Sequence, residues 1–220
     1  MNTRPRLYAH PFSSYCQKVL VALYENDTPF EYRHLEEPGV AEELAALWPM
    51  GKFPVLVDGE RTVLESSCII EHLQLHHPGP VPMIPADPDT ALEVRMLDRF
   101  FDNYISTPLQ TVVAERLRPE GVNPDPHGVG EARRMFETSY AWLDARMAHQ
   151  EWAVGDAFSL ADCGAAPSLF YADWTHEIDA RFTHLRAYRE RLLARPSVKR
   201  AVDEARPYRS YFPLGAPDRD

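Results

Sequence analysis

Residues 7–23 of the chain read LYAHPFSSYCQKVLVAL. The apolar start breaks into a small polar loop at Ser13 and Ser14, and apolar residues then return at helical spacing. This pattern predicts a short strand over 6–10 and a helix over 15–26. A hydroxyl at the start of a helix lies beside unpaired backbone N–H groups and the positive end of the helix dipole. The loop is therefore a candidate site for holding an anion.

Composition narrows the class of protein. With 220 residues, 45% of them hydrophobic, the chain can bury the core of one large domain or two small ones. The formal charge is −10 and the basic residues are scattered, so we do not expect nucleic-acid binding. Cys16, Cys68 and Cys163 are odd in number and widely spaced, which argues against a disulfide framework or a zinc site.

The same features favour a reducing, cytoplasmic location. The first residues lack the apolar core of a signal peptide, and no apolar run approaches the roughly 20 residues that span a bilayer. We therefore expect no contact with a membrane. The nine histidines are expected to be surface or packing side chains, and no metal site is predicted.

The chain divides into two halves of different character. After the first strand and helix we predict a strand over 30–35, a helix over 40–47, two strands within 53–64 and a helix over 66–76. The Asp58-Gly59 pair marks the hairpin turn. This βαβαββα order predicts an α/β domain over residues 1–77.

Five prolines in the next stretch predict a linker over 78–89, and an all-helical domain is predicted over 90–220. Its expected helices cover 91–106 or beyond, 130–149, 159–175, 182–194 and 197–204.

Three short motifs accompany this order. They are SSYC at 13–16, GKFPVL at 51–56 followed by LESSCII at 64–70, and SLAD at 159–162. Together with the domain order, they resemble serine-type, bacterial-like members of the soluble glutathione transferase family over nearly the whole chain. The resemblance implies a thioredoxin-like N-terminal domain, an all-α C-terminal helical bundle, and glutathione as co-substrate.

By this resemblance, the hydroxyl of Ser13 hydrogen-bonds the sulfur of glutathione; Ser14 is the second choice, and Cys16 is a packing residue of the helix. A free thiol is only about 3% thiolate at neutral pH. Lowering its pKa by two units corresponds to roughly 2.7 kcal/mol. The alternative is that Ser13 serves only as the helix N-cap.

The resemblance also assigns the rest of the glutathione site. Pro54 would follow a cis peptide bond, so that the backbone of Phe53 faces the cysteinyl amide. Glu65 would pair with the γ-glutamyl ammonium, Ser66 would bind the adjacent carboxylate, and Lys52 would pair with the glycyl carboxylate. The structural alternatives are a strand-start proline, an N-cap and a solvated lysine.

The second substrate is expected where the first helix of the bundle meets the Ser13 loop. The candidate lining residues are Phe12, Tyr15, Arg99, Asn103, Tyr104, Thr107 and Trp174. Aromatic residues at helical spacing also occur in cores, which is the alternative for this set. His10 lies near the loop, but its expected role is packing. Ser159 and Asp162 are expected to form a helix-capping box, whose loss costs about 1 kcal/mol or more.

The resulting prediction is a homodimeric glutathione transferase that joins glutathione thiolate to a small electrophile. One alternative is a cis–trans isomerase similar to maleylacetoacetate isomerases, although Ser-Ser-Tyr-Cys-Gln-Lys departs from their usual Ser-Ser-Cys with a downstream Arg. A second is a non-catalytic glutathione-binding or regulatory protein, because a fold does not determine function. A reductase is disfavoured because position 13 is not a cysteine.

Overall fold

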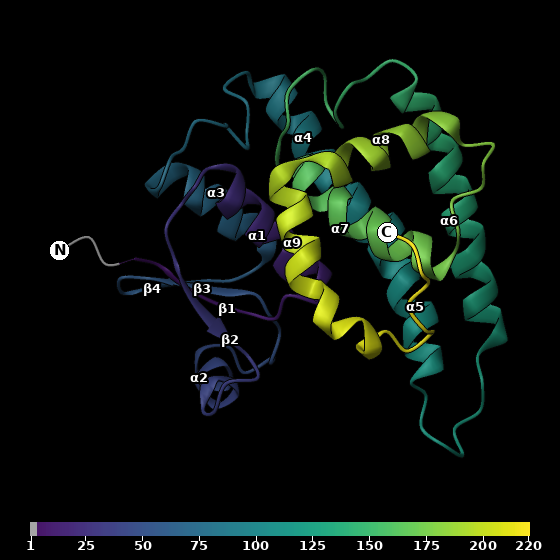
Figure 1. Ribbon diagram of the computed structural model, residues 1–220, viewed down its shortest axis with the longest axis horizontal. Helices are drawn as coiled ribbons and strands as arrows, with labels where there is room; N and C mark the ends of the chain where they lie inside the picture. The colour runs from purple at the N-terminus through teal and green to yellow at the C-terminus, as the bar shows by residue number, and fades with distance from the viewer. Residues whose placement is uncertain (1–3) are drawn as a thin grey trace.

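The computed structural model describes residues 4–220 (Figure 1). Its N-terminal part contains one four-stranded sheet in the order β2-β1-β3-β4. The strands are β1 (Arg6–Ala9), β2 (Glu31–His34), β3 (Val55–Asp58) and β4 (Arg61–Val63). Strand β1 runs parallel to β2 and antiparallel to β3, which pairs antiparallel with β4. The predicted strands and their hairpin are thus present, and the sheet is mixed.

The two faces of the sheet are covered by different helices, as Figure 1 shows. Leu7 and Leu56 pack in the core with α1 (Ser14–Glu25) and α3 (Ser66–His76). Tyr8, Val55 and Val57 instead pack with α2 (Val40–Leu47) on the opposite face. Side chains alternate between the faces of a strand, so the consecutive apolar residues 7–9 of β1 and 55–57 of β3 require a helix on each side of the sheet.

The helical part begins with α4 (Pro88–Phe100), inside the stretch predicted as linker. Asp87 caps this helix by accepting the N–H of Thr90 at 2.8 Å. Pro88 occupies the first turn, where its missing N–H costs nothing. A proline that ends a linker can thus also start a helix.

A π-helical turn, η1 (Phe101–Ser106), joins α4 to α5 (Thr107–Arg116). Pro108 has no N–H to donate to the carbonyl of Tyr104, and the hydroxyl of Ser139 donates to that oxygen instead, at 3.2 Å. The N–H of Thr107 bonds five residues back, to the carbonyl of Asp102. Such turns are frequent at functional sites.

Helix α7 (Leu160–Thr175) is buried from Leu160 through Trp174 and packs against α1, α4, η1, α5 and α8. The remaining helical elements are α6 (Pro126–Met147), α8 (Thr183–Ala194), α9 (Pro196–Ala205) and the 3-10 turn η2 (Arg206–Tyr211). Helix α6 starts before the predicted residue 130 because Asp125 caps it by accepting the N–H of Gly128 at 2.8 Å. Within residues 4–220, no helix is both long and apolar enough to cross a membrane.

The Ser159–Asp162 pair lies at the start of α7. The carboxylate of Asp162 accepts the backbone N–H and the hydroxyl of Ser159, at 2.9 and 3.1 Å. It also accepts the N–H of Ala153 at 2.8 Å and the hydroxyl of Tyr188 at 2.7 Å. Burial raises the pKa of Asp162, and these donors oppose that rise. The carboxylate therefore joins α7 to a loop and to α8 as well as capping the helix.

Candidate functional site

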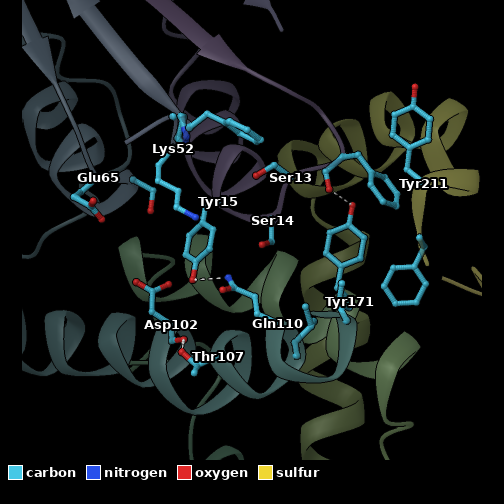
Figure 2. Close-up of a pocket in the computed structure, with 18 of the residues that line it drawn as sticks. Ser13, Ser14, Tyr15, Lys52, Glu65, Asp102, Thr107, Gln110, Tyr171 and Tyr211 are labelled. Carbon is cyan, nitrogen blue, oxygen red and sulfur yellow. Dashed lines mark hydrogen bonds between the residues drawn. The ribbon is translucent and has the colours of Figure 1, made fainter. Parts of the chain in front are cut away.

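A cavity of about 750 Å³ lies between the sheet-containing part and the helices (Figure 2). The starts of α1 and α3 form one side, α4, η1 and α5 form another, and the segment after η2 closes a third. Its described lining includes Phe12, Ser13, Ser14, Tyr15, Trp48, Lys52, Phe53, Pro54, Glu65, Ser66, Arg99, Asp102, Asn103, Thr107, Gln110, Tyr171, Tyr211 and Phe212.

The two serines lie where α1 begins, and Figure 2 shows both at one wall of the cavity. Ser13 is the N-cap: its hydroxyl oxygen accepts the N–H of Cys16 at 3.4 Å. This leaves the hydroxyl proton of Ser13 for donation to a ligand. Ser14 is the first residue of the helix, so its backbone N–H is one of those that the helix itself does not pair. Capping and ligand binding are therefore compatible at Ser13.

Cys16 faces away from the cavity into the core. Its side chain is fully buried, and burial raises the pKa of its thiol to about 12. A thiol with that pKa is protonated at neutral pH and is a packing group rather than a nucleophile.

A second helix start, that of α3, opens into the same cavity. Glu65 is its N-cap and has φ +66° and ψ 123°, a region that side-chain-bearing residues rarely adopt. Its side chain does not cap the helix. Such backbone strain costs about 1–3 kcal/mol and concentrates at functional sites. The Phe53–Pro54 peptide bond nearby is cis, as the resemblance implied.

Beneath this wall lies a buried ion network. Nζ of Lys18 lies 2.5 Å from Asp98 and 3.2 Å from Asp102, and donates to the hydroxyl of Ser67 at 3.0 Å. Arg99 donates to the same hydroxyl at 2.9 Å. Burial raises the pKa of Asp102, and the nearby Lys18 opposes that rise. The network joins α1, α3, α4 and η1, and its outer members Arg99 and Asp102 line the cavity.

The opposite wall is aromatic. The hydroxyl of Tyr171 accepts from the Gln17 amide and donates to the carbonyl of Phe12, both at 2.9 Å. The rings of Phe12 and Tyr171 meet edge to face at 5.3 Å. The wall of Phe12 and Tyr171 can hold an apolar or aromatic ligand and offers few polar groups. Tyr15 lies apart from it, between Lys52 and Asp102 in Figure 2, and its hydroxyl accepts from the Gln110 amide at 3.2 Å. Burial raises the pKa of Tyr15, so its hydroxyl remains protonated at neutral pH.

Of the residues singled out in the sequence, most lie around this one cavity. The structure brings together Phe12, Ser13, Tyr15, Lys52, Phe53, Pro54, Glu65, Ser66, Arg99, Asn103 and Thr107. Their contacts with a ligand stay a prediction.

Two substrate-pocket candidates lie elsewhere. Tyr104 is exposed beside Phe100, their ring centroids 5.2 Å apart, because successive residues of a helical turn point in different directions and Asn103 takes the direction of the cavity. Trp174 is buried behind Tyr171, where its ring packs against Phe212 at 5.3 Å. Neither residue belongs to the described lining of the cavity, in contrast to the expected position, and their contact with a substrate stays a prediction.

His10 bonds to Glu36 at 3.2 Å and packs against Tyr208, in agreement with the expected packing role. The lining residues that the sequence analysis missed include Asp102, Gln110, Tyr171, Tyr211 and Phe212. Gln110 could have been found, since it continues the helical face of Arg99, Asn103 and Thr107. Tyr211 and Phe212 follow the last predicted helix, and no periodic pattern placed them.

Known families match both halves of the chain. Residues 7–81 match the family described as glutathione S-transferase, N-terminal domain, and residues 112–191 match glutathione S-transferase, C-terminal domain. The chain belongs to the glutathione S-transferase family. Its fold class is accordingly a thioredoxin-like N-terminal domain with a helical C-terminal domain.

Individual glutathione S-transferase relatives differ in their names. A glutathione S-transferase from Methylobacterium radiotolerans, crystallised with glutathione sulfonate, is 31% identical with a TM-score of 0.77 and covers 91% of this chain and 95% of its own. FtsZ-localized protein A of Caulobacter vibrioides is 27% identical over 90% of this chain and 91% of that protein. A probable maleylacetoacetate isomerase of Caenorhabditis elegans is 26% identical over 78% and 80%, respectively. Family membership alone therefore does not determine the reaction.

Proposed function

We propose that this protein binds glutathione and transfers it, as the thiolate, to a small electrophile. The observation that carries the proposal is the opening of two helix N-termini, at Ser13 and at Glu65–Ser66, into one cavity. Each supplies unpaired N–H groups and a positive dipole end, and glutathione has anionic groups for both.

The tripeptide would lie along the wall formed by α3 and the Phe53–Pro54 segment. Glu65 pairs with the γ-glutamyl ammonium, and the Ser66 hydroxyl with the first N–H groups of α3 binds the adjacent carboxylate. The backbone of Phe53 pairs with the cysteinyl amide. Lys52 lines the cavity and extends toward Tyr15 in Figure 2, which supports its pairing with the glycyl carboxylate. This orientation brings the thiol to Ser13.

Ser13 then stabilises the sulfur as an anion. Donation from its hydroxyl, added to the dipole of α1, would lower the thiol pKa by about two units, or roughly 2.7 kcal/mol. The thiolate attacks an electrophilic carbon and forms a C–S bond. Either a leaving group departs with its electron pair, or, on a conjugated acceptor, the neighbouring carbon takes a proton from water. Ser13 keeps its own proton throughout.

The electrophile would bind against the aromatic wall of Phe12, Tyr171 and Phe212. Since that wall is mainly apolar, an aromatic or aliphatic carbon electrophile suits it better than a highly charged one. The protonated hydroxyl of Tyr15, which also lines the cavity, would donate to a polar group of the electrophile.

We further propose a homodimer. Leu92 and Met96 of α4 leave apolar side chains exposed, and Trp142 of α6 does the same on a neighbouring helix of the bundle. Pairing with the small domain of a second copy, where Leu75 is exposed, would cover them.

The test is turnover with a panel of electrophiles, beginning with chlorodinitrobenzene, together with retention on immobilised glutathione. The proposal expects retention and conjugation, with conjugation reduced at least about tenfold in Ser13→Ala and less in Ser14→Ala. Retention without conjugation of any electrophile would favour a binding or regulatory protein. Double-bond isomerisation of a conjugated cis acid without net consumption of glutathione would favour the isomerase.

A further inference from the structure

Three potential metal ligands converge at the edge of the small domain. Nε2 of His72 lies 2.9 Å from Oδ2 of Asp58, and Nε2 of His77 lies 2.8 Å from the same oxygen. All three ligand atoms lie within 4.8 Å of one another. The side chains are mostly but not completely buried, which leaves a path for an ion and water.

Each of the three side chains comes from a helix or strand or from the residue that ends one. Asp58 is the last residue of β3, at the β3–β4 hairpin. His72 lies within α3, and His77 is its C-cap, where its backbone N–H donates to the carbonyl of Leu73 at 2.7 Å. The carboxylate thus comes from the sheet and both imidazoles come from the helix. Ligands on rigid elements need little reordering when an ion binds.

The donor set suits a borderline-soft divalent cation. Two imidazole nitrogens and one carboxylate oxygen are a common protein contribution to a zinc site. With metal–ligand bonds of about 2.0–2.1 Å, ligand atoms in a tetrahedral site lie about 3.3 Å apart. Small side-chain rotations of Asp58, His72 and His77 would open the observed 2.8–2.9 Å contacts to that separation. The metal would replace the protons that now join the imidazoles to the carboxylate.

A further histidine, His76, lies close to these three residues but outside the group of converging ligand atoms. The rings of His72 and His76 lie 4.4 Å apart, centroid to centroid, and Nε2 of His76 now contacts Arg61 at 3.2 Å. Either His76 or a water molecule could complete the coordination. His72 and His76 lie one helical turn apart in the sequence. The expectation that the histidines hold no metal did not take this spacing into account.

We propose that Asp58, His72 and His77 form a binding site for a divalent transition-metal ion, with zinc as its chemical type. None of these three residues belongs to the described lining of the cavity. The ion would fasten the β3–β4 hairpin to the C-terminal end of α3, the helix whose other end carries Ser66. Binding to the folded state alone would raise stability in proportion to the logarithm of metal concentration.

A second group, His10, His34 and Glu36, serves as the internal comparison. There the ligand atoms already bond to tyrosines: His34 contacts the hydroxyl of Tyr208 at 3.1 Å, and Glu36 accepts that of Tyr211 at 2.9 Å. Glu36 is also exposed. That group is better explained as the attachment of η2 to the sheet.

The experiment uses the full chain without an affinity tag, stripped with a chelator. Zn²⁺ is titrated in competition with a chromophoric chelator, and Co²⁺ is used for its visible absorption. The proposal expects one equivalent of Zn²⁺ and an intense visible Co²⁺ band, with affinity falling about tenfold or more in His77→Gln. The matched controls His127→Gln, an exposed helical histidine, and His34→Gln should keep parental affinity.

Circular dichroism of the metal-free variants establishes that each is folded. Asp58→Asn, which keeps the shape of the side chain, should also lose Zn²⁺ affinity and so gives a second, independent test. The proposal is overturned if Zn²⁺ does not bind, if His77→Gln and Asp58→Asn bind it as the parent does, or if His34→Gln abolishes binding. Metal binding is the readout, so its failure would leave the glutathione proposal standing.

Discussion

Glu65 combines an unusual backbone conformation with a charge at the mouth of the cavity. Glu65→Gln keeps the shape of the side chain but removes the charge that would pair with the ammonium of glutathione. We expect the affinity for glutathione to fall about tenfold, or 1.4 kcal/mol, measured by isothermal titration calorimetry. Glu60→Gln, in the exposed hairpin turn, is the control and should bind as the parent does. Equal affinity in both variants would remove Glu65 from the proposed site.

Some individual site residues could be predicted from the sequence, and others could not. Ser13, Glu65 and Ser66 could be placed because each lies at a helix start, which short-range patterns mark. Tyr104 could not, because deciding between it and its neighbour Asn103 requires the rotation of the helix about its axis. That rotation depends on the π turn, where Pro108 has no N–H for the carbonyl of Tyr104 and Ser139 of another helix donates to it instead.

Helix α7 depends on one buried carboxylate. Asp162→Asn replaces one of the two acceptor oxygens with an NH₂ group, which cannot accept a hydrogen bond. Either the donors of Ser159 or those of Ala153 and Tyr188 then lose their acceptor. We expect the free energy of unfolding to fall by about 2 kcal/mol or more, measured by urea denaturation. Asp156→Asn, a nearby exposed aspartate, should change it by less than about 0.5 kcal/mol. A loss of similar size in both variants would contradict the argument.

Most helices and strands could be predicted because their patterns are local. The strands of the βαβαββα unit and the start of α1 follow from periodicity and turn residues within a few positions. The starts of α4 and α6 were set too late, since Asp87 and Asp125 cap them ahead of the first apolar repeat. The short turn η2 packs against the distant His34 and His10, a contact that no local pattern encodes.

Contacts between distant parts of the chain also predict that the free energy of unfolding depends on pH. Burial lowers the pKa of His10, where η2 packs on the sheet, although Glu36 opposes this. A histidine whose pKa is lower folded than unfolded contributes stability above its unfolded pKa, about 6.5, and loses it as the pH falls. We expect the free energy of unfolding to decrease from pH 7.5 to about 5.5, and the decrease to be smaller in His10→Gln. An identical decrease in this variant and in the exposed-site control His127→Gln would exclude His10 as a cause.

The proposed dimer makes a prediction about assembly. Leu92→Glu puts a charge on the exposed apolar face of α4 and should convert the dimer to a monomer, as measured by sedimentation velocity. Val122→Glu, at an exposed position in the α5–α6 loop, should leave the dimer intact. A parent protein that is already monomeric at micromolar concentration would contradict the dimer.

The central claim is that Ser13 holds glutathione as a thiolate. It is tested most directly by the ultraviolet absorbance of the bound thiolate against pH, in the parent and in Ser13→Ala. We expect the parent complex to titrate about two units below free glutathione, and the titration of the Ser13→Ala complex to move back up toward the free thiol. A complex that titrates like the free thiol, or a Ser13→Ala complex that titrates like the parent, would contradict it.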